Sequence, residues 1–212
     1  MNELLHVGII PDGNRRWARS RGLTIRDAYE AGYSKLKEVA RYLFDYNVRY
    51  LTVYAMSYDN CVKRDADERN ALLRVLDKAI VDLKRERLLD EYDVKLVVSG
   101  DLTLIPDGTR RKIQDLVERY SSGRRVLHVG LCYSVWWELS QLKHRNLGFE
   151  QRMPPIDLVI RTGGARRISG FFPLLVEYAE LYFTDTLWPE LTRRELDLAI
   201  EWFKRQRRNF GR

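Results

Sequence analysis

The segment HVGIIPDGNRRWAR, residues 6–19, joins a short apolar run to an abrupt polar turn. The run His6–Ile10 is almost wholly apolar, which is typical of a strand buried on both faces of a parallel sheet. Asp12, Gly13 and Asn14 tolerate the unusual backbone angles of a turn, and they place a carboxylate directly after the strand. Three arginines then follow at the start of a predicted helix. The segment therefore predicts a strand, a turn and a helix in succession.

The same alternation continues along the rest of the chain. Short runs rich in Val, Ile, Leu and Tyr predict further strands. They are Tyr50–Ala55, Val94–Ser99, Val126–Leu131, Ile156–Ile160 and Leu181–Thr184. Helical periodicity marks residues 33–45, 70–85 and 109–120, and a helix is predicted after Thr192, which forms a capping-box pattern with Glu195. We therefore expect one α/β domain over residues 1–212, with a mostly parallel central sheet of about six strands flanked by helices. Ligands of such sheets bind beyond the carboxyl ends of the strands.

Composition narrows the class of protein. The chain has 212 residues, a net charge of +7 and 45% hydrophobic residues, which suits one soluble domain with an acidic partner such as a phosphate, a nucleic acid or an anionic membrane surface. Charge alone does not choose among these partners. Because no nucleic-acid-binding motif is present, we expect no nucleic acid.

Location and redox state can also be predicted. No run reaches the roughly 20 apolar residues of a membrane span, and the first ten residues are typical of a strand and not of a signal peptide. Two cysteines, Cys61 and Cys132, and three histidines lack metal-ligand spacing, so no zinc or iron–sulfur site is expected. Two isolated cysteines are more typical of a reducing cytosol than of a disulfide scaffold. We therefore expect a cytoplasmic protein, with membrane association possible through its product.

The turn at Asp12 has two interpretations. In the first, Asp12 only caps the helix and the arginines are a solvated face. In the second, a divalent cation bridges Asp12 to a phosphate, because Mg²⁺ usually takes one or two carboxylates together with substrate phosphates. Arginine forks bind phosphate oxygens in the same setting. Residues far along the chain favour the second interpretation.

Two blocks carry a resemblance to a known family. Asp12-Gly13-Asn14-Arg15-Arg16-Trp17-Ala18 after a short strand closely resembles the opening signature of the cis-prenyltransferases, the undecaprenyl and dehydrodolichyl diphosphate synthases. Residues 156–189, with Arg161-Thr162-Gly163-Gly164 and then Arg167-Ile168-Ser169, resemble the second signature block. The resemblance covers essentially the whole chain and thins between about residues 61 and 155. It implies a Mg²⁺-dependent transferase that condenses isopentenyl diphosphate with an allylic diphosphate to give a cis-polyprenyl diphosphate.

The resemblance also implies roles for individual residues. Catalytic roles fall to Asp12 and Asn60, and Mg²⁺ to Asp12 with Glu180. The allylic diphosphate would be held by Gly13, Asn14, Arg15, Arg16, Trp17, Arg26 and Tyr29. Isopentenyl diphosphate would be held by Ser57, Arg161, Arg167 and Ser169. An apolar tunnel for the prenyl chain would lie between the helices at residues 33–45 and 70–85. A homodimer is implied, with a C-terminal arm at residues 208–211 near the partner's site.

Some of these roles have simpler alternatives. Asn60 can equally be a turn residue, Arg161 and Arg167 can form surface ion pairs, and Glu180 can be a solvated strand end. The tunnel residues can simply be core. In the same way, the basic C-terminal residues can be an ordinary helix end.

The sequence also departs from the family pattern at several positions. Tyr29 replaces a histidine, Ala165 replaces a glutamate, and Cys61 replaces a tryptophan. The family segment Asn-Tyr-Gly-Gly-Arg is Cys132–Trp136 here. These changes motivate a second hypothesis, a weakly active or regulatory subunit of a heteromeric cis-prenyltransferase. The sequence determines neither product length nor the preferred allylic primer.

Overall fold

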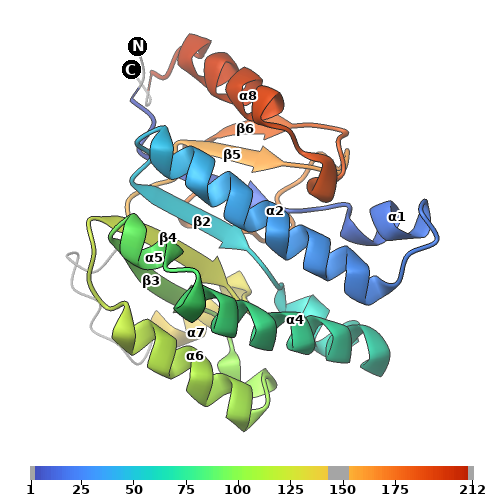
Figure 1. Cartoon of the computed structure of the whole chain (residues 1–212). Coiled ribbons are helices and arrows are strands. Elements are labelled where there is room, and N and C mark those ends of the chain that lie inside the picture. Colours follow the sequence, from blue (N-terminus) through green and yellow to red (C-terminus); the bar gives the residue numbers. More distant parts are fainter. Residues whose placement is uncertain (1–2, 143–152, 210–212) are drawn as a thin grey trace.

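Six parallel strands form the centre of the molecule in the computed structural model, which describes residues 3–142 and 153–209 (Figure 1). Their order across the sheet is β3-β4-β2-β1-β5-β6. The strands are β1 (His6–Ile10), β2 (Tyr50–Tyr54), β3 (Val94–Ser99), β4 (Arg125–Gly130), β5 (Leu158–Arg161) and β6 (Glu180–Phe183). The predicted parallel α/β sheet is therefore confirmed, strand by strand, to within two residues at each end.

Helices connect the successive strands from β1 to β5, as expected of a parallel sheet. They are α1 (Asn14–Arg19), α2 (Ile25–Asp45), α3 (Tyr58–Lys63), α4 (Ala66–Arg85), α5 (Leu88–Glu91), α6 (Asp107–Arg119), α7 (Val135–Leu142) and α8 (Arg193–Arg205). The capping box predicted at Thr192 is present, since its side chain accepts from the Glu195 amide and the Glu195 side chain accepts from the Thr192 amide. Similar boxes begin α2 at Thr24 and α3 at Ser57.

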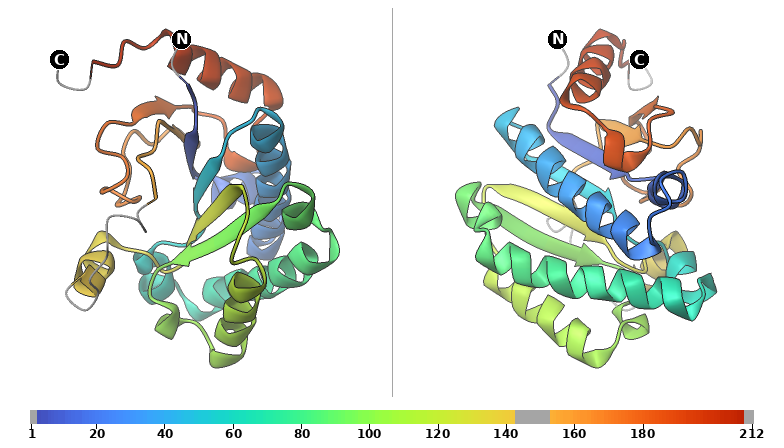
Figure 2. Two further views of the ribbon diagram at one scale, coloured as in Figure 1. Left: turned by 90° about the vertical axis from the view of Figure 1, so that its left-hand side faces the viewer. Right: turned by 45° about the vertical axis from the view of Figure 1, so that its right-hand side comes forward.

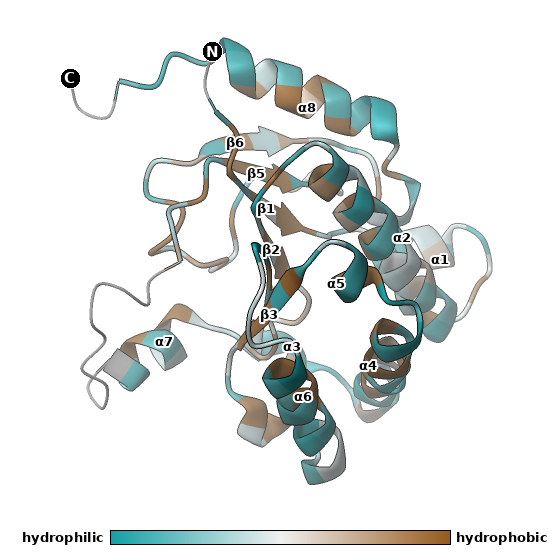
Figure 3. Cartoon of the chain, turned by 60° about the vertical axis from the view of Figure 1, so that its left-hand side comes forward, coloured by the Kyte–Doolittle hydropathy of each residue, from teal (hydrophilic) through white to brown (hydrophobic). Residues whose placement is uncertain are grey.

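The two faces of the sheet carry different cores. On one face, apolar residues of α2, α4, α6 and α8 pack on the strands in the larger cluster. On the other face, Tyr133, Phe171 and Phe172 pack with Ile156 and Val159 in a smaller aromatic cluster near α7. The left view of Figure 2 shows α7 on the side of the sheet opposite α4 and α6. Figure 3 shows that apolar residues gather on the strands and on the inner sides of the helices.

Topology fixes where a ligand can bind. In the sheet, β2 lies on one side of β1 and β5 lies on the other. The connection from β1 to β2 and the connection from β4 to β5 therefore run in opposite directions across the sheet. Crevices at such points, beyond the carboxyl ends of the strands, are the usual ligand sites of α/β sheets. Asp12 and Thr162 follow directly on these strand ends, and Ser57 comes three residues after the end of β2.

The two cysteines are not free. Cys61 and Cys132 form a disulfide, with their Cα atoms 5.7 Å apart, and the expectation of two isolated thiols is wrong. The reason lies in the sheet order, because β2 and β4 are neighbours and α3 begins beside the end of β4. A separation of 71 residues in the sequence concealed this proximity.

Among the described residues, none of the helices combines the length and the apolar content that crossing a membrane would require.

Candidate active site

The turn after β1 is held by backbone contacts to two distant segments. The Thr162 hydroxyl accepts a hydrogen bond from the Asp12 amide at 3.0 Å and donates to the Asp12 carbonyl at 2.7 Å. The Trp188 amide donates to the same carbonyl at 3.0 Å. Thr162 is wholly buried, and no role was assigned to it from the sequence although it lies inside the second block. The position of Asp12 is thus set by the strand ends and not by its own short helix.

Two glycines make this close approach possible. Gly163 has φ +79°, and a Cβ atom there would lie 2.5 Å from Arg16 Nη2. Gly13 has φ +110°, and its Cβ atom would lie 2.8 Å from Leu187 Cδ2. Both conformations belong to the region that favours glycine. Gly13 is accordingly a packing residue of the turn, buried beneath Leu187.

The Asp12 carboxylate lies between two guanidinium groups. Arg161 Nη2 is 2.8 Å from Asp12 Oδ2, and Arg16 Nη2 is 3.3 Å from Asp12 Oδ1. The carboxylate is one-third exposed, whereas the Arg161 side chain is only 5% exposed. The helix-cap interpretation fails, because Gly13 occupies the cap of α1 and no side chain caps that helix.

Arg161 links three predicted site residues. Its Nη1 donates to the Ser169 hydroxyl at 2.9 Å and to the Arg167 carbonyl, while Nη2 binds Asp12. Its Nε is buried and has no hydrogen-bond partner among the described residues. Arg161 is therefore a buried residue that holds Asp12, Arg167 and Ser169 in place, and it is not part of a surface ion pair. Arg167 is exposed, and its side chain makes no ion pair with any residue in the described ranges.

A polar cavity of about 1040 Å³ lies beyond these strand ends. It brings together the turn after β1, the loop after β2, the start of α7 and the loop after β5. The predicted site residues that line it are Asp12, Asn14, Tyr29, Ser57, Asn60, Arg161 and Ser169. These residues are separated by up to 157 positions in the sequence and share one cavity only because the strands are parallel and adjacent.

Ser57 and Asn60 lie across this cavity from Asp12 and form the first turn of α3. The Ser57 hydroxyl accepts from the Asn60 amide, and Asn60 Oδ1 accepts from the Ser57 amide, both at 3.2 Å. The Asn60 side chain is therefore both a helix cap and a wall of the cavity, which leaves its Nδ2 group as a donor for a ligand.

Asn14 turns inward in the same way. Its Nδ2 donates to the Pro11 carbonyl at 3.1 Å, while its Oδ1 is buried without a partner among the described residues. A Cβ atom on Gly32 would lie 2.4 Å from that oxygen. Asn14 consequently braces α1 against α2.

Tyr29, Arg64 and Glu68 form a polar cluster beside the cavity, which Tyr29 and Arg64 line. Tyr29 donates to Glu68 Oε1 at 2.5 Å, and Arg64 Nη1 lies 2.8 Å from the same oxygen. Arg15 Nη1 approaches it at 3.7 Å. Burial and the Glu68 carboxylate raise the pKa of the Tyr29 hydroxyl, so it remains a neutral donor. Glu68 and Arg64 were not assigned from the sequence, although their spacing of four residues at a helix start was a visible signal.

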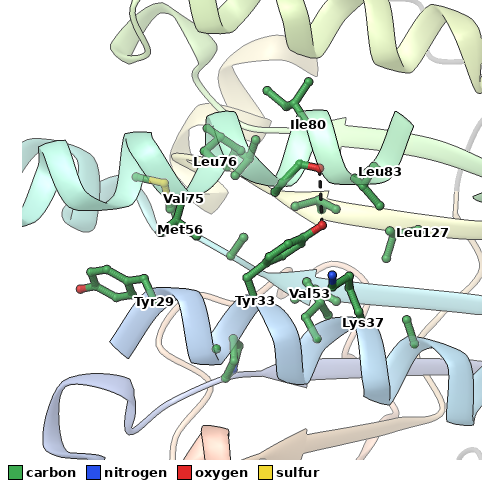
Figure 4. A pocket seen from close by; sticks show the side chains of 18 of the residues that line it. Tyr29, Tyr33, Lys37, Val53, Met56, Val75, Leu76, Ile80, Leu83 and Leu127 are labelled. Atoms are coloured by element: carbon green, nitrogen blue, oxygen red, sulfur yellow. Dashed lines mark hydrogen bonds between the residues drawn. The ribbon is translucent and has the colours of Figure 1, made fainter. Parts of the chain in front are cut away.

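An apolar cavity of about 180 Å³ adjoins the polar one between α2, α4 and the sheet (Figure 4). Tyr29, Ala55 and Leu72 line both cavities. In Figure 4 the ring of Tyr33 crosses from α2 to α4, where its hydroxyl reaches the Ala79 carbonyl at 3.5 Å. Lys37 Nζ lies 2.6 Å from Glu86 Oε1, joining α2 to the end of α4. This cavity lies where the tunnel was predicted.

Several predicted residues do not line either cavity; they are Gly13, Arg15, Arg16, Trp17, Arg26, Arg167, Glu180 and Arg208. Trp17 lies under the guanidinium of Arg21, whose Cζ atom is 5.1 Å from the ring centre. Arg26 is exposed on α2, with Nε 2.7 Å from Glu30 Oε1. Arg208 Nη1 is 2.8 Å from Asp157 Oδ1, at the amino end of β5. Residues 210 and 211 of the predicted arm lie outside the described residues.

The predicted pairing of Glu180 with Asp12 on one ion is wrong within a single chain. Glu180 begins β6 and is level with Leu158, whereas Asp12 lies two residues beyond Ile10, which is level with Arg161. Five strand positions separate the two levels, or roughly 16 Å at about 3.3 Å per residue. Parallel strands put the start of β6 and the end of β1 at opposite edges of the sheet.

The chain is similar to known prenyl diphosphate synthases over nearly its whole length. The family model described as putative undecaprenyl diphosphate synthase matches residues 10–211. A tritrans,polycis-undecaprenyl-diphosphate synthase of Aeropyrum pernix, named as geranylgeranyl-diphosphate specific, is 42% identical over 97% of each chain. An isoprenyl transferase of Campylobacter jejuni is 32% identical over 100% of both chains.

Solved structures share the fold. A probable undecaprenyl diphosphate synthase from Campylobacter jejuni covers 100% of both chains, with a TM-score of 0.80 and 27% identity. Lavandulyl diphosphate synthase from Lavandula x intermedia, solved with dimethylallyl diphosphate, covers 98% of both chains, with a TM-score of 0.84 and 23% identity. The extent of the family match and the identity to the Aeropyrum protein show that this chain belongs to the undecaprenyl diphosphate synthase family and is a cis-prenyltransferase.

Proposed function

We propose that this enzyme lengthens an allylic diphosphate by condensing it with isopentenyl diphosphate, and that Asp12 holds the Mg²⁺ required for the step. The observation that carries the proposal is the junction of the two cavities. A polar chamber lined by Asp12, Arg64 and Arg161 suits diphosphates, and the adjoining apolar chamber between α2 and α4 suits a prenyl chain.

The donor set at Asp12 fits Mg²⁺. Mg²⁺ prefers oxygen ligands and commonly takes one or two carboxylates, leaving its other positions to phosphates and water. The Asp12 carboxylate follows the end of β1 and is one-third exposed. The Ser169 hydroxyl, a further oxygen, accepts a hydrogen bond from Arg161, which also binds Asp12. When bound, Mg²⁺ would stabilise the negative charge of the departing diphosphate.

The chain's own residues position the two substrates. Arg15 and Arg16 stand on the exposed side of the turn, where they can hold the leaving diphosphate. Arg167 and Ser169 stand on the β5 side, where they can hold isopentenyl diphosphate. Arg161 keeps Asp12 and Ser169 in a fixed relation, which is the kind of positioning that brings two reactants into line. Ser57 and Asn60 line the same cavity, where the Asn60 amide and the Ser57 hydroxyl can contact the bound substrates.

Tyr29 keeps the junction polar on one side. Its hydroxyl is engaged by Glu68 and Arg64, and its ring lines the apolar chamber. The substitution of tyrosine for histidine therefore removes a titratable group near neutral pH but keeps a hydrogen-bond donor at the junction.

We infer that geranylgeranyl diphosphate is an accepted primer, because the 42% identical Aeropyrum relative is named as specific for it. A second copy of the chain would cover the edge strand β6 and the segment before it, where Leu181, Leu174 and Tyr178 are exposed. A homodimer is therefore proposed. Contact with a membrane surface is proposed only through the lipid product.

The test uses purified protein alone, with labelled isopentenyl diphosphate, Mg²⁺ and primers of increasing length. We expect elongated cis products, no product with EDTA, and restoration on adding Mg²⁺. Asp12→Asn should abolish nearly all turnover with an unchanged circular dichroism spectrum, while Asp59→Asn on the same cavity serves as the matched control. Activity of Asp12→Asn within a few-fold of the parent would refute the assignment of the metal site. If no product forms without a second protein, the chain is a subunit of a heteromeric enzyme.

A further inference from the structure

The disulfide joins two segments whose adjacent residues, Asn60 and Tyr133, line the polar cavity. Cys61 follows Asn60 directly in α3, and Cys132 directly precedes the loop that leads into α7. Both sulfur-bearing residues are buried, with exposures of 5% and 0%. The cross-link therefore joins the segment that carries Ser57 and Asn60 to the neighbouring segment 133–137, which also lines the cavity.

The disulfide anchors a short helix. α3 has only six residues, and Cys61 is its one buried residue in the described structure. A helix of this length is not stable by itself in water. The helix start is also held by backbone bonds, because the Tyr58 amide donates to the Tyr133 carbonyl at 2.8 Å and the Met56 amide to the Gly130 carbonyl at 3.0 Å. Those bonds fix the entry to α3, whereas the disulfide fixes its body.

The partner segment is equally dependent on Cys132. This residue has φ +50°, a conformation that side chains rarely adopt, and its carbonyl accepts from the Asp101 amide at 3.2 Å. The residues that follow, 133–137, all line the polar cavity. Cys132 is thus the pivot at which β4 ends and the cavity wall begins.

Two departures from the family pattern meet here. By the resemblance described above, Cys61 stands where the family segment has tryptophan, and Cys132 stands where another segment has asparagine. In the sequence these changes look independent. In the structure they are two halves of one covalent contact, so one cross-link occupies the place of two unrelated side chains.

We propose that the Cys61–Cys132 disulfide is a positioning element of the active site, which holds Ser57 and Asn60 against the wall formed by residues 133–137. The proposal rests on the function proposed above for Ser57 and Asn60. It predicts that opening the bond slows the chemical step, while the binding of the allylic primer at Arg15 and Arg16 is little changed because that turn is held by Thr162 and Trp188.

The experiment compares three states of the full-length protein. The first is the enzyme as purified. The second is the enzyme treated with dithiothreitol, which converts the disulfide to two thiols and is itself oxidised to its cyclic disulfide. The third is Cys61→Ala/Cys132→Ala, in which the reductant has no target because the chain has no other cysteine. Val62→Ala, an exposed neighbour on α3, is the matched control for loss of a side chain from this helix.

Four measurements are made on each state. Thiols are counted by alkylation and mass spectrometry, kcat and KM are measured for both substrates, the fold is followed by circular dichroism, and amide hydrogen exchange is followed over residues 57–64 and 133–137. We expect no free thiol in the enzyme as purified. Reduction and the double substitution should lower kcat by roughly tenfold or more. The KM of the allylic primer should stay within about twofold, and exchange should accelerate in both segments.

Several results would overturn the inference. Two free thiols per chain before reduction would show that the cross-link is not formed. Unchanged kcat with the bond open would show that it contributes stability alone. An equal loss for Val62→Ala would show that α3 is sensitive to any change. If the double variant does not fold, the reduced enzyme decides. If no state shows turnover, the proposed function is wrong. In that case, equal rates of amide hydrogen exchange over residues 57–64 and 133–137 with the bond closed and open would separately refute the positioning role of the disulfide.

Discussion

Four hydrogen-bonding side chains cross the middle of the sheet, and they make stability depend on pH. His6 Nε2 is 2.7 Å from Thr52 Oγ1, which is 3.3 Å from His128 Nδ1. His128 Nε2 is 2.8 Å from Ser99 Oγ, and His6 Nδ1 is 2.8 Å from the Pro154 carbonyl. Since a carbonyl can only accept, His6 donates from Nδ1 and accepts at Nε2. The chain of bonds is complete with both imidazoles neutral.

Burial sets the protonation state of both rings. It lowers the pKa of His6 from 6.5 to about 4 and that of His128 to about 3, and the neighbouring His6 adds to the effect on His128. Below pH 6.5 the unfolded chain binds protons that the folded chain does not accept. The corresponding stability is therefore complete above pH 6.5 and is lost as the pH falls toward 4. Between pH 7 and pH 5 each histidine should lower the free energy of unfolding by roughly 2 kcal/mol, or about 4 kcal/mol together.

Urea unfolding at pH 7, 6 and 5 measures this directly, with stability taken from the midpoint and the slope of each curve. His128→Gln should lower the stability at pH 7 by removing a buried hydrogen-bonded ring, but should make the dependence on pH shallower by about half. His6→Gln should do the same. A parent protein with equal stability at pH 7 and pH 5, or variants with an unchanged dependence, would refute the assignment of two neutral buried histidines.

Three further predictions concern the cavity walls. Tyr33→Ala should lengthen the products by one or more isoprene units in mass spectrometry, because the ring of Tyr33 lies across the apolar cavity between α2 and α4. Tyr33→Phe keeps the ring and should leave the products unchanged. Identical products from both variants would contradict this. Glu68→Ala should lower the free energy of unfolding, measured in urea, by roughly 3 kcal/mol because the Arg64 guanidinium loses its carboxylate partner. Asp67→Ala, on the exposed side of the same turn, should lower it little. Equal losses in the two variants would contradict this prediction. Opening the disulfide should lower the free energy of unfolding by about 4 kcal/mol, because the bond closes a long loop in the unfolded chain. Calorimetry should show this as a fall of roughly 10 °C in Tm. An unchanged Tm would contradict the prediction.

Several features of the fold could be predicted because they depend on local pattern. The strands are short continuous apolar runs, and β1, β2 and β5 have buried centres on both sides of the sheet. The helices have one apolar face, and the capping box at Thr192 needs only residues three positions apart. The motifs at Asp12 and Arg161 were recognisable for the same reason, since each is a turn that directly follows a strand.

The sequence does not give the level of a residue along a strand or its partners on other elements. Glu180 was paired with Asp12 on one ion, but it opens its strand while Asp12 follows the end of another. Arg26 was predicted at the allylic diphosphate, and the structure shows it exposed on α2 in an ion pair with Glu30. Glu68 was overlooked because its partner Tyr29 lies 39 residues away on another helix.

The sequence alone determined that this protein is a parallel α/β domain with an acidic turn among arginines, because those properties follow from periodicity and from residues that are close together along the chain. Only the tertiary structure decided which distant side chains share a cavity. The strand order places β2 beside both β1 and β4, and this brings Asp12 to Ser57 and Cys61 to Cys132. Contacts between residues on neighbouring parallel strands require the register of those strands, which no local pattern contains.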